Sequence, residues 1–353
     1  MFQKHFGACR FIYNWALENK IKSYETEGKS VSRFTLNKMI PSLKTEYQWL
    51  KEINSQSLQG ATLNLENAFT KFFREGKGFP KFKSRKNPVQ SFSVPQYYNV
   101  DFENNAIKIP KIGWVNTKLH RHFDGKCKTA TVSKTPSGKY FISILIDDGI
   151  KYPEKQDFDE NTTVGIDVGI KDFAILSDGT KIVNPSSLKK SIKRLKVLNK
   201  RLSRKQKGSK NREKAKIEIA KIHERISNQR HDFQHKLSSR LISENQAIAL
   251  ESLNVNGMLK NHRLAQSISD ASWSSFVSKL EYKAQWHGKI ILRIGQFEPS
   301  TKICNVCGYC NKYLTLADRR WQCPKCGTYH DRDVNAANNI KKFALDKQAI
   351  IGT

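Results

Sequence analysis

Long apolar runs are absent from this sequence of 353 residues. The longest apolar stretch, residues 141–146, has the length of one β-strand, whereas a membrane-spanning helix requires about 18 or more apolar residues. The first twenty residues mix lysine, histidine, arginine and asparagine with aromatic side chains, so they lack the apolar segment of a secretory signal peptide. We therefore predict a cytoplasmic protein without a membrane partner.

Acidic residues are also scarce. The chain has 32 Asp and Glu residues against 62 Lys and Arg residues, which gives a formal net charge of +30. Hydrophobic residues make up 38% of the chain and aromatic residues 10%, which is the composition of a folded protein and not of a disordered basic tail. Neither terminus carries the basic amphipathic helix or lipidation signal that acidic lipid would require. The expected polyanionic partner is therefore nucleic acid.

The seven cysteines lack the even spread of a secreted disulfide framework, since five of them lie within residues 304–326. This segment holds two copies of Cys-x-x-Cys-Gly, and each copy can offer two thiolates to one tetrahedral ion. Cys310 lacks the following glycine and is predicted to be no ligand. The predicted ligands of a structural Zn²⁺ are Cys304, Cys307, Cys323 and Cys326. Four sulfurs leave no open position for a substrate, so this zinc would not be catalytic.

Apolar periodicity predicts an α+β multidomain fold. Helical spacing dominates the first part of the chain, short strands with turns follow, and strands then alternate with helices. The predicted parts are residues 1–85 (helical), 86–155 (a small β-barrel or sandwich), 156–302 (strands and helices), 303–328 (the cysteine segment) and 329–353 (a final segment with a helix).

Two segments concentrate positive charge. Residues 75–83 alternate basic and aromatic side chains, so they could place rings on bases and lysines on phosphates, or form an ordinary surface turn. Residues 188–241 are predicted to form an antiparallel helix pair that breaks near Gly208. Between Lys189 and Lys236 there are 18 basic and 4 acidic residues. A polyanion would relieve their repulsion, and the alternative is a solvated helix face.

Three carboxylates occupy positions that folding alone does not favour. Asp167 lies inside an apolar strand, Glu251 ends the apolar run of residues 247–250, and Asp333 lies just ahead of the last helix. Buried carboxylates destabilise a fold unless positive charge neutralises them. Two Mg²⁺ or Mn²⁺ ions would do so and would activate water for phosphodiester cleavage. Each residue also has another reading: a strand of an ATPase for Asp167, a surfacing strand end for Glu251, and a helix N-cap for Asp333.

The order of these motifs resembles the TnpB family, the OrfB-type proteins of insertion sequences that are related to type V CRISPR effectors. The specific motifs lie in the C-terminal half, and the likeness extends over nearly the whole chain. It rests on residues 165–169, residues 250–253, the two Cys-x-x-Cys-Gly pairs and residues 331–337, with further likeness at residues 6–17 and 77–83.

The resemblance implies an RNase H-like (RuvC) α/β nuclease core interrupted by a zinc ribbon and preceded by a helical recognition domain and a wedge-like β-barrel. It implies a prokaryotic endonuclease that acts at the nucleoid, depends on Mg²⁺ or Mn²⁺, and uses a noncoding guide RNA against double-stranded DNA. Asp167, Glu251 and Asp333 would be the catalytic metal ligands, with Asp333 preferred over Asp331. Arg319 or Arg320 would stabilise charge in the transition state.

Members of this family usually carry a strand ahead of the helix that contains residues 6–17, whereas Met1 falls almost at that helix here. The resemblance therefore implies that one strand of the wedge barrel is missing. Two readings stay open: an RNA-guided endonuclease that helps to retain a transposable element, and a truncated or nuclease-inactive RNA-guided DNA-binding protein. A transposase in the strict sense is not favoured, because the sequence shows no paired-histidine motif or nucleophilic tyrosine context.

Overall fold

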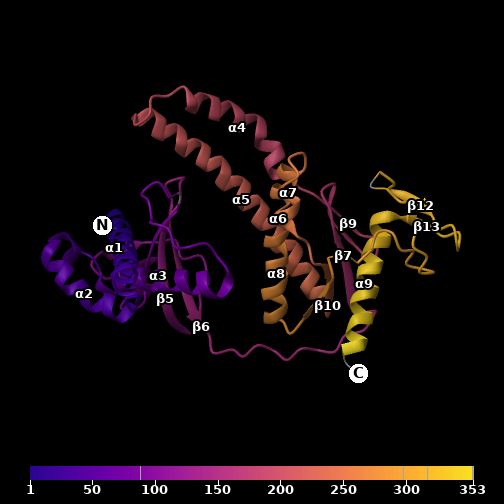
Figure 1. Cartoon of the computed structure of the whole chain (residues 1–353), viewed down its shortest axis with the longest axis horizontal. Helices are drawn as coiled ribbons and strands as arrows, with labels where there is room; N and C mark the ends of the chain where they lie inside the picture. The colour runs from indigo at the N-terminus through magenta and orange to yellow at the C-terminus, as the bar shows by residue number, and fades with distance from the viewer. Residues whose placement is uncertain (88, 297, 316, 352–353) are drawn as a thin grey trace. The chain divides into compact units, whose positions relative to one another are not determined.

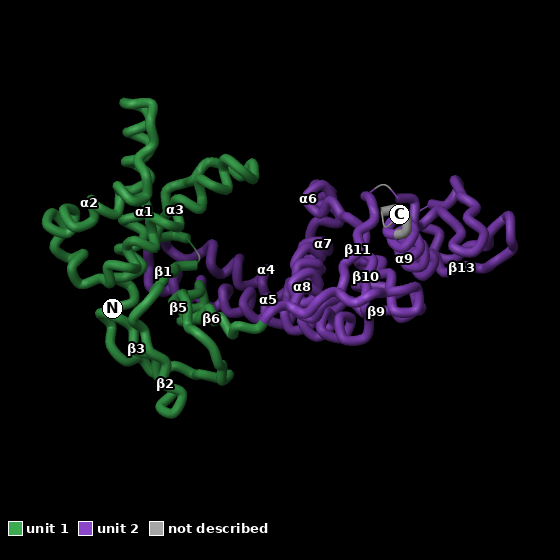
Figure 2. Tube along the Cα trace, turned by 90° about the horizontal axis from the view of Figure 1, so that it is seen from below, with its two compact units in different colours: residues 1–150 green, residues 151–353 purple. Residues whose placement is uncertain are grey.

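The computed structural model describes residues 1–87, 89–296, 298–315 and 317–351. The chain folds into two compact units, Met1–Ile150 and Lys151–Thr353, which are green and purple in Figure 2. No helix of the described ranges is long and apolar enough to cross a membrane. The five-part division stays a prediction, and residues 88, 297, 316, 352 and 353 within it lie outside the described residues.

Helices open the first unit. Their apolar faces pack with the following strands into one core, in which Leu58 is fully buried. The side chains of Ser32 and Asn54 cap two helix N-termini, and Gly28 and Gly76 end two helices in the left-handed conformation. The elements are α1 (Phe2–Glu27), α2 (Arg33–Glu46), the 3₁₀ helix η1 (Gln48–Glu52) and α3 (Ser55–Glu75).

Two three-stranded antiparallel sheets complete this unit. One has the order β1-β5-β6 and the other β2-β3-β4, so a closed barrel stays a prediction. Alternate residues such as Phe92, Val94 and Val132 are buried against the helices. Strands β2 and β4 are not predicted from the sequence, because three or four residues show no clear alternation. The strands are β1 (Gln90–Val94), β2 (Asn99–Asp101), β3 (Ala106–Ile109), β4 (Gly113–Asn116), β5 (Lys126–Lys134) and β6 (Tyr140–Asp147).

A five-stranded mixed sheet organises the second unit (Figure 1). Its order is β11-β10-β7-β8-β9, with β7 at the centre. Strand β8 pairs antiparallel with both β7 and β9, whereas β10 runs parallel to both β7 and β11. The strands are β7 (Thr163–Val168), β8 (Asp172–Leu176), β9 (Lys181–Val183), β10 (Ala247–Glu251) and β11 (Ile290–Ile294).

The basic segment between β9 and β10 forms the expected helix pair. Helices α4 (Ser187–Ser203) and α5 (Lys210–Glu244) run antiparallel and side by side in Figure 1. Gly208 turns the chain between them with a φ of 86°. The Asp270 carboxylate accepts a hydrogen bond of 3.0 Å from the backbone N–H of Leu188, which fixes the start of α4.

Helices cover both faces of the five-stranded sheet. Ile166 of β7 and Leu250 of β10 share one hydrophobic cluster with residues of α5, α7 and α8, whereas Ala247 of β10 packs with residues of α9. Gly165 lies against α9, where a Cβ atom would be 2.1 Å from the carbonyl oxygen of Ala337. Glycine therefore lets α9 approach β7 directly. Besides α4 and α5, the helices of this unit are α6 (Val255–Met258), α7 (Ala265–Ala271), α8 (Trp273–Trp286) and α9 (Arg332–Ile351).

A small ribbon lies between β11 and α9. Its strands β12 (Arg320–Gln322) and β13 (Tyr329–Asp331) pair antiparallel, and β13 leads directly into α9. Asn335 and Asn339, one turn apart on α9, donate side-chain hydrogen bonds of 2.7 and 2.6 Å to the carbonyl oxygen of Ile303. These two bonds fasten the beginning of the ribbon to α9.

Candidate functional site

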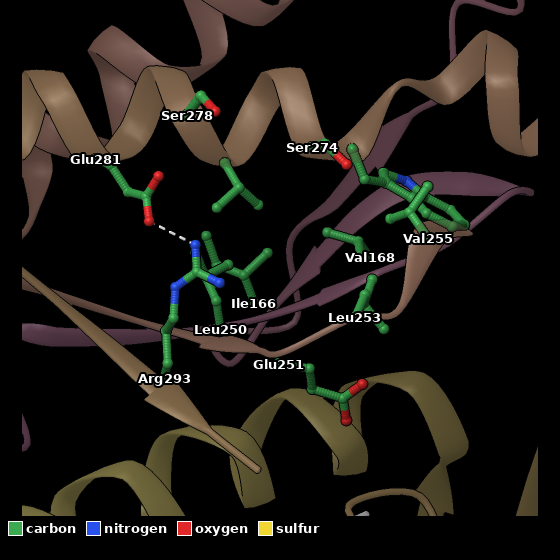
Figure 3. A pocket seen from close by; sticks show the side chains of 12 residues that line it. Ile166, Val168, Leu250, Glu251, Leu253, Val255, Ser274, Ser278, Glu281 and Arg293 are labelled. Atoms are coloured by element: carbon green, nitrogen blue, oxygen red, sulfur yellow. Dashed lines mark hydrogen bonds and ion pairs between the residues drawn. The ribbon is translucent and has the colours of Figure 1, made fainter. Parts of the chain in front are cut away.

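Asp167 and Glu251 lie at the ends of two neighbouring parallel strands. Leu250 pairs with Ile166, and the next residue of each strand is Glu251 and Asp167, respectively. The two carboxylates therefore lie at the same level of the sheet. Because successive side chains of a strand alternate between faces, both carboxylates lie on the face that α9 covers. Figure 3 shows the Glu251 carboxylate on the opposite side of its strand from Ser278 of α8. Ligands of α/β sheets commonly bind at such strand ends.

Asp333 reaches the same face from the first turn of α9. Asp331 provides the N-cap of this helix, because its Oδ1 accepts hydrogen bonds of 3.2 and 3.3 Å from the backbone N–H groups of Asp333 and Val334. The N-cap reading of Asp333 is therefore wrong. The contact of Ala337 with Gly165, one helical turn further on, brings the start of α9 beside the end of β7.

Asp167 and Asp333 line one cavity of about 780 Å³. Four cationic side chains line the same cavity: Lys171, Lys302, Arg319 and Arg332. Carboxylates and cations that line one open pocket could hold metal ions together with the phosphates of a ligand.

Glu251 lines a second cavity of about 200 Å³, shown in Figure 3. Val168 and Trp273 border both cavities, so the two pockets share a wall. The other charged groups of the smaller pocket are Glu281 and Arg293, which form an ion pair of 2.5 Å. The structure thus places Glu251 next to the larger cavity but not among its lining residues.

The position of Asp167 is electrostatically unfavourable without a cation. Burial is the main reason that the pKa of its carboxyl rises from 3.8 to about 8. The charges of Glu251 and Asp333 raise this pKa further, whereas the charges of Arg332 and Arg319 lower it. Part of the Asp167 surface opens into the larger cavity, so a bound cation could reach it and remove the penalty.

The other two carboxylates have hydrogen-bonding partners. The Ser300 hydroxyl donates to Glu251 at 2.5 Å. Asp333 accepts from Arg319 at 3.1 Å and from Arg332 at 3.0 Å. The three carboxylates do not form a compact cage: within the described residues only a cysteine group brings three or more ligand atoms within 4.8 Å of one another.

The four cysteines named above converge in the ribbon, with all of their Sγ atoms within 4.8 Å. Cys304 and Cys326 have sulfurs 3.7 Å apart, and the sulfurs of Cys307 and Cys323 are 3.6 Å apart. Four sulfurs bound tetrahedrally at about 2.3 Å from Zn²⁺ would be about 3.8 Å apart. The donor set and its spacing therefore fit zinc. Cys310 is exposed and lies outside this group.

Models of known protein families match three stretches of the chain. The OrfB model described as "Probable transposase" matches residues 147–262. The model "Cas12f1-like, TNB domain" matches residues 273–340, which contain the cysteine group and Asp333. A "Helix-turn-helix domain" model matches residues 1–29, where the structure has the single helix α1.

Known relatives extend this likeness to nearly the whole chain. "Putative RNA-guided DNA endonuclease" of Streptomyces pristinaespiralis is 38% identical over 351 residues, covering 98% of this chain and 85% of the relative. "Putative RNA-guided DNA endonuclease InsQ" of Escherichia coli (strain K12) is 34% identical, covering 95% and 86%. A "TnpB-like protein" of Acanthamoeba polyphaga mimivirus is 28% identical over 201 residues, covering 53% and 38%. This chain belongs to the TnpB family.

A solved structure shows how far the TnpB likeness reaches in three dimensions. The Cas12f1 chain of a Cas12f1–sgRNA–target DNA complex superimposes with a TM-score of 0.58 at 15% identity, covering 96% of this chain and 82% of that chain. At this identity the match shows a shared fold, which here is mixed α/β with a four-cysteine cluster.

His330 is a further residue of this TnpB-family site that cysteine spacing does not predict. Its Nε2 atom lies 3.1 Å from the Sγ atom of Cys304, and its ring lies against Trp321 at 4.7 Å between centroids. The side chain is buried. A ring N–H directed at a thiolate orients that ligand and stabilises its charge. The only sequence signal is that His330 precedes Asp333 by three positions.

Proposed function

We propose that this member of the TnpB family is an RNA-guided DNA endonuclease of a prokaryotic insertion sequence. The observation that carries the proposal is that Asp167, Glu251 and Asp333 reach one face of one sheet from two adjacent strands and from the helix packed on it. The strand order β11-β10-β7-β8-β9 supports an RNase H-like (RuvC) core. The names of the relatives, and the sgRNA and target DNA of the solved complex, support a guide RNA and double-stranded DNA as partners.

Asp167, Glu251 and Asp333 would hold Mg²⁺ or Mn²⁺, because carboxylate oxygens are the ligands these ions prefer. When bound, such ions activate water and stabilise the leaving oxygen of a phosphodiester. Arg319 lines the larger cavity and contacts Asp333, whereas Arg320 does not line it. We therefore assign the stabilisation of phosphate charge to Arg319.

The remaining parts have roles that follow from their chemistry. Zinc held by the four cysteines would stabilise the ribbon, which carries Arg319 and leads into α9 through β13. The basic helix pair α4–α5 would bind phosphates of the guide–target duplex. Residues 1–85 would form the recognition domain and residues 86–155 the wedge, which together would read the RNA and the motif beside the target.

The test separates cutting from binding. The protein is expressed together with its native flanking DNA, the RNA that copurifies is sequenced, and both cleavage and binding of a matching DNA duplex are measured with Mg²⁺. Asp167→Ala is expected to abolish cleavage and to leave RNA-dependent DNA binding nearly unchanged. The control is Asp157→Ala, which changes an exposed carboxylate of the same unit and should still cut. Equal loss of cutting and binding would show that Asp167 is structural.

A second function, RNA-guided DNA binding without cutting, is favoured by one observation. Arg319 and Arg332 already neutralise Asp333, and Ser300 donates to Glu251, so two of the three carboxylates have protein partners. In that case the native protein would bind the target with its RNA and leave both strands intact at every Mg²⁺ or Mn²⁺ concentration.

A further inference from the structure

Four phenylalanines gather at the end of α3 and in the loop that follows. Phe79 lies edge-on to Phe69 and to Phe72, in both cases with ring centroids 5.5 Å apart. Phe73 joins the group through Phe72 at 4.9 Å. We call these four residues the phenylalanine cluster. Phe73 is 76% exposed and Phe79 is 48% exposed, so two of the four rings are open to a partner.

The loop that carries Phe79 is held from both sides. Gly76 ends α3 with a φ of 61°, and Pro80 is buried directly after Phe79. The backbone N–H of Lys83 donates to Oδ1 of Asn14 at 2.7 Å, and the Asn14 amide donates back to the Lys83 carbonyl at 2.9 Å. A surface that is already ordered loses little conformational entropy when it binds a partner. This arrangement is therefore better suited to binding than a free surface turn would be.

Positive charge surrounds the cluster. Residues 69–86 contain seven Lys and Arg residues and one Glu. Within the described residues, no ion pair to a carboxylate is formed by the exposed side chains of Lys71, Arg74, Lys77 and Lys81. Open aromatic rings among unpaired cations match a ligand that joins flat bases through phosphates. Charge complementarity thus favours nucleic acid with unpaired bases over a protein partner.

We propose that the phenylalanine cluster stacks on unpaired bases of the guide RNA, with Lys77 and Lys81 contacting the flanking phosphates. This inference rests on the proposed function, which provides two nucleic acids. Exposed aromatic groups promote unwanted association unless a partner covers them. Under the proposed function the guide RNA would stay bound between encounters with DNA and could cover the rings throughout, whereas target DNA would be bound only during an encounter. The RNA is therefore the occupant.

The experiment uses the full-length protein, freed of cellular RNA, and a short single-stranded RNA that contains 2-aminopurine, whose fluorescence falls on stacking. The double variant Phe73→Ala/Phe79→Ala is expected to weaken RNA binding by about tenfold or more and to abolish the fluorescence change. Phe73→Tyr/Phe79→Tyr should restore both, whereas Phe73→Leu/Phe79→Leu should not, because leucine keeps the apolar bulk without a ring. Phe34→Ala, at an exposed phenylalanine of α2, is the matched control.

The salt dependence of RNA binding distinguishes the contribution of the rings from that of the charges. Lys77→Gln/Lys81→Gln is expected to reduce the slope of log affinity against log salt by about 1.4, whereas the ring variants should leave that slope unchanged. Wild-type RNA affinity in the double alanine variant, or recovery with leucine, would overturn the stacking proposal. Ring-dependent loss of fluorescence from 2-aminopurine placed in the target DNA of the assembled complex, and not from 2-aminopurine placed in the guide RNA, would overturn the assignment to RNA. If RNA binding does not depend on the rings but the protein cleaves its target, this inference alone is refuted. If RNA binding depends on the rings but the protein does not cleave, the proposed function alone is refuted.

Discussion

Replacing Asp167 by asparagine is expected to stabilise the metal-free protein while removing a ligand of the proposed catalytic ions. The pKa of Asp167 rises from 3.8 to about 8 in the folded protein, so at neutral pH the folded state must take up a proton that the unfolded chain does not bind. Over the roughly three pH units between the unfolded pKa and pH 7, at about 1.4 kcal/mol per unit, this destabilises folding by on the order of 4 kcal/mol. Asparagine is neutral at every pH and avoids this penalty.

The pH dependence has a definite sign. Between pH 3.8 and about 8 the folded state binds more protons at Asp167 than the unfolded state, so this group makes folding less favourable as the pH rises through that window. The difference in stability between Asp167→Asn and the wild type should be small near the lower pKa and should grow until the pH reaches the upper one. Below the lower pKa both states are protonated and the difference vanishes.

Thermal unfolding measures this difference. The protein is dialysed against buffer without Mg²⁺ or Mn²⁺, and no chelator is added, so that the zinc expected on the cysteines is kept. Tryptophan fluorescence includes a probe at the site, because Trp273, one of six tryptophans, borders both cavities. For a unit of this size we expect Asp167→Asn to melt roughly 10 °C above the wild type at pH 7. Added Mg²⁺ should raise the Tm of the wild type and leave the variant unchanged. A variant that melts at or below the wild-type Tm at pH 7, or a difference that is the same at every pH, would refute the reasoning.

Two further predictions concern the metal centre and the basic helices. Cys323→Ser should release about one zinc per chain and lower the Tm, as measured by metal analysis and melting, whereas Cys127→Ser, at an exposed cysteine outside the group, should keep its zinc. Unchanged zinc in the Cys323 variant would contradict the ribbon assignment. Lys193→Glu/Lys200→Glu should flatten the salt dependence of nucleic-acid binding, because two exposed cations of α4 are lost. An unaltered slope would show that this face of α4 is exposed to solvent and does not contact nucleic acid.

Features that depend on neighbours along the chain are predictable from the sequence. Strand β10 follows the apolar run of residues 247–250 with Glu251 at its end, and the helix pair breaks at Gly208. The four cysteines meet because each Cys-x-x-Cys turn presents two sulfurs by itself. Strands β2 and β4 are not predicted, because they are too short to show a period.

Contacts between distant segments are not predictable from one sequence. The pattern places Asp167 in a strand, but only the sheet order places it beside Glu251. Cysteine spacing does not identify His330, because its contact with Cys304 depends on how β13 lies against the first cysteine pair. The resemblance prefers Asp333, which lines the cavity, but the motif around residues 331–337 does not reveal that Asp331 caps the helix.

The ribbon and the carboxylate site form one connected structure. The His330 ring contacts Cys304, and the next residue, Asp331, caps the helix that carries Asp333. From the same ribbon, Arg319 reaches Asp333 at 3.1 Å. Loss of zinc would free the thiolates to repel one another and would release β13 from the cysteines, so both the start of α9 and Arg319 would lose their support. A zinc ion that takes no part in the chemistry would therefore still determine the position of the Asp333 carboxylate.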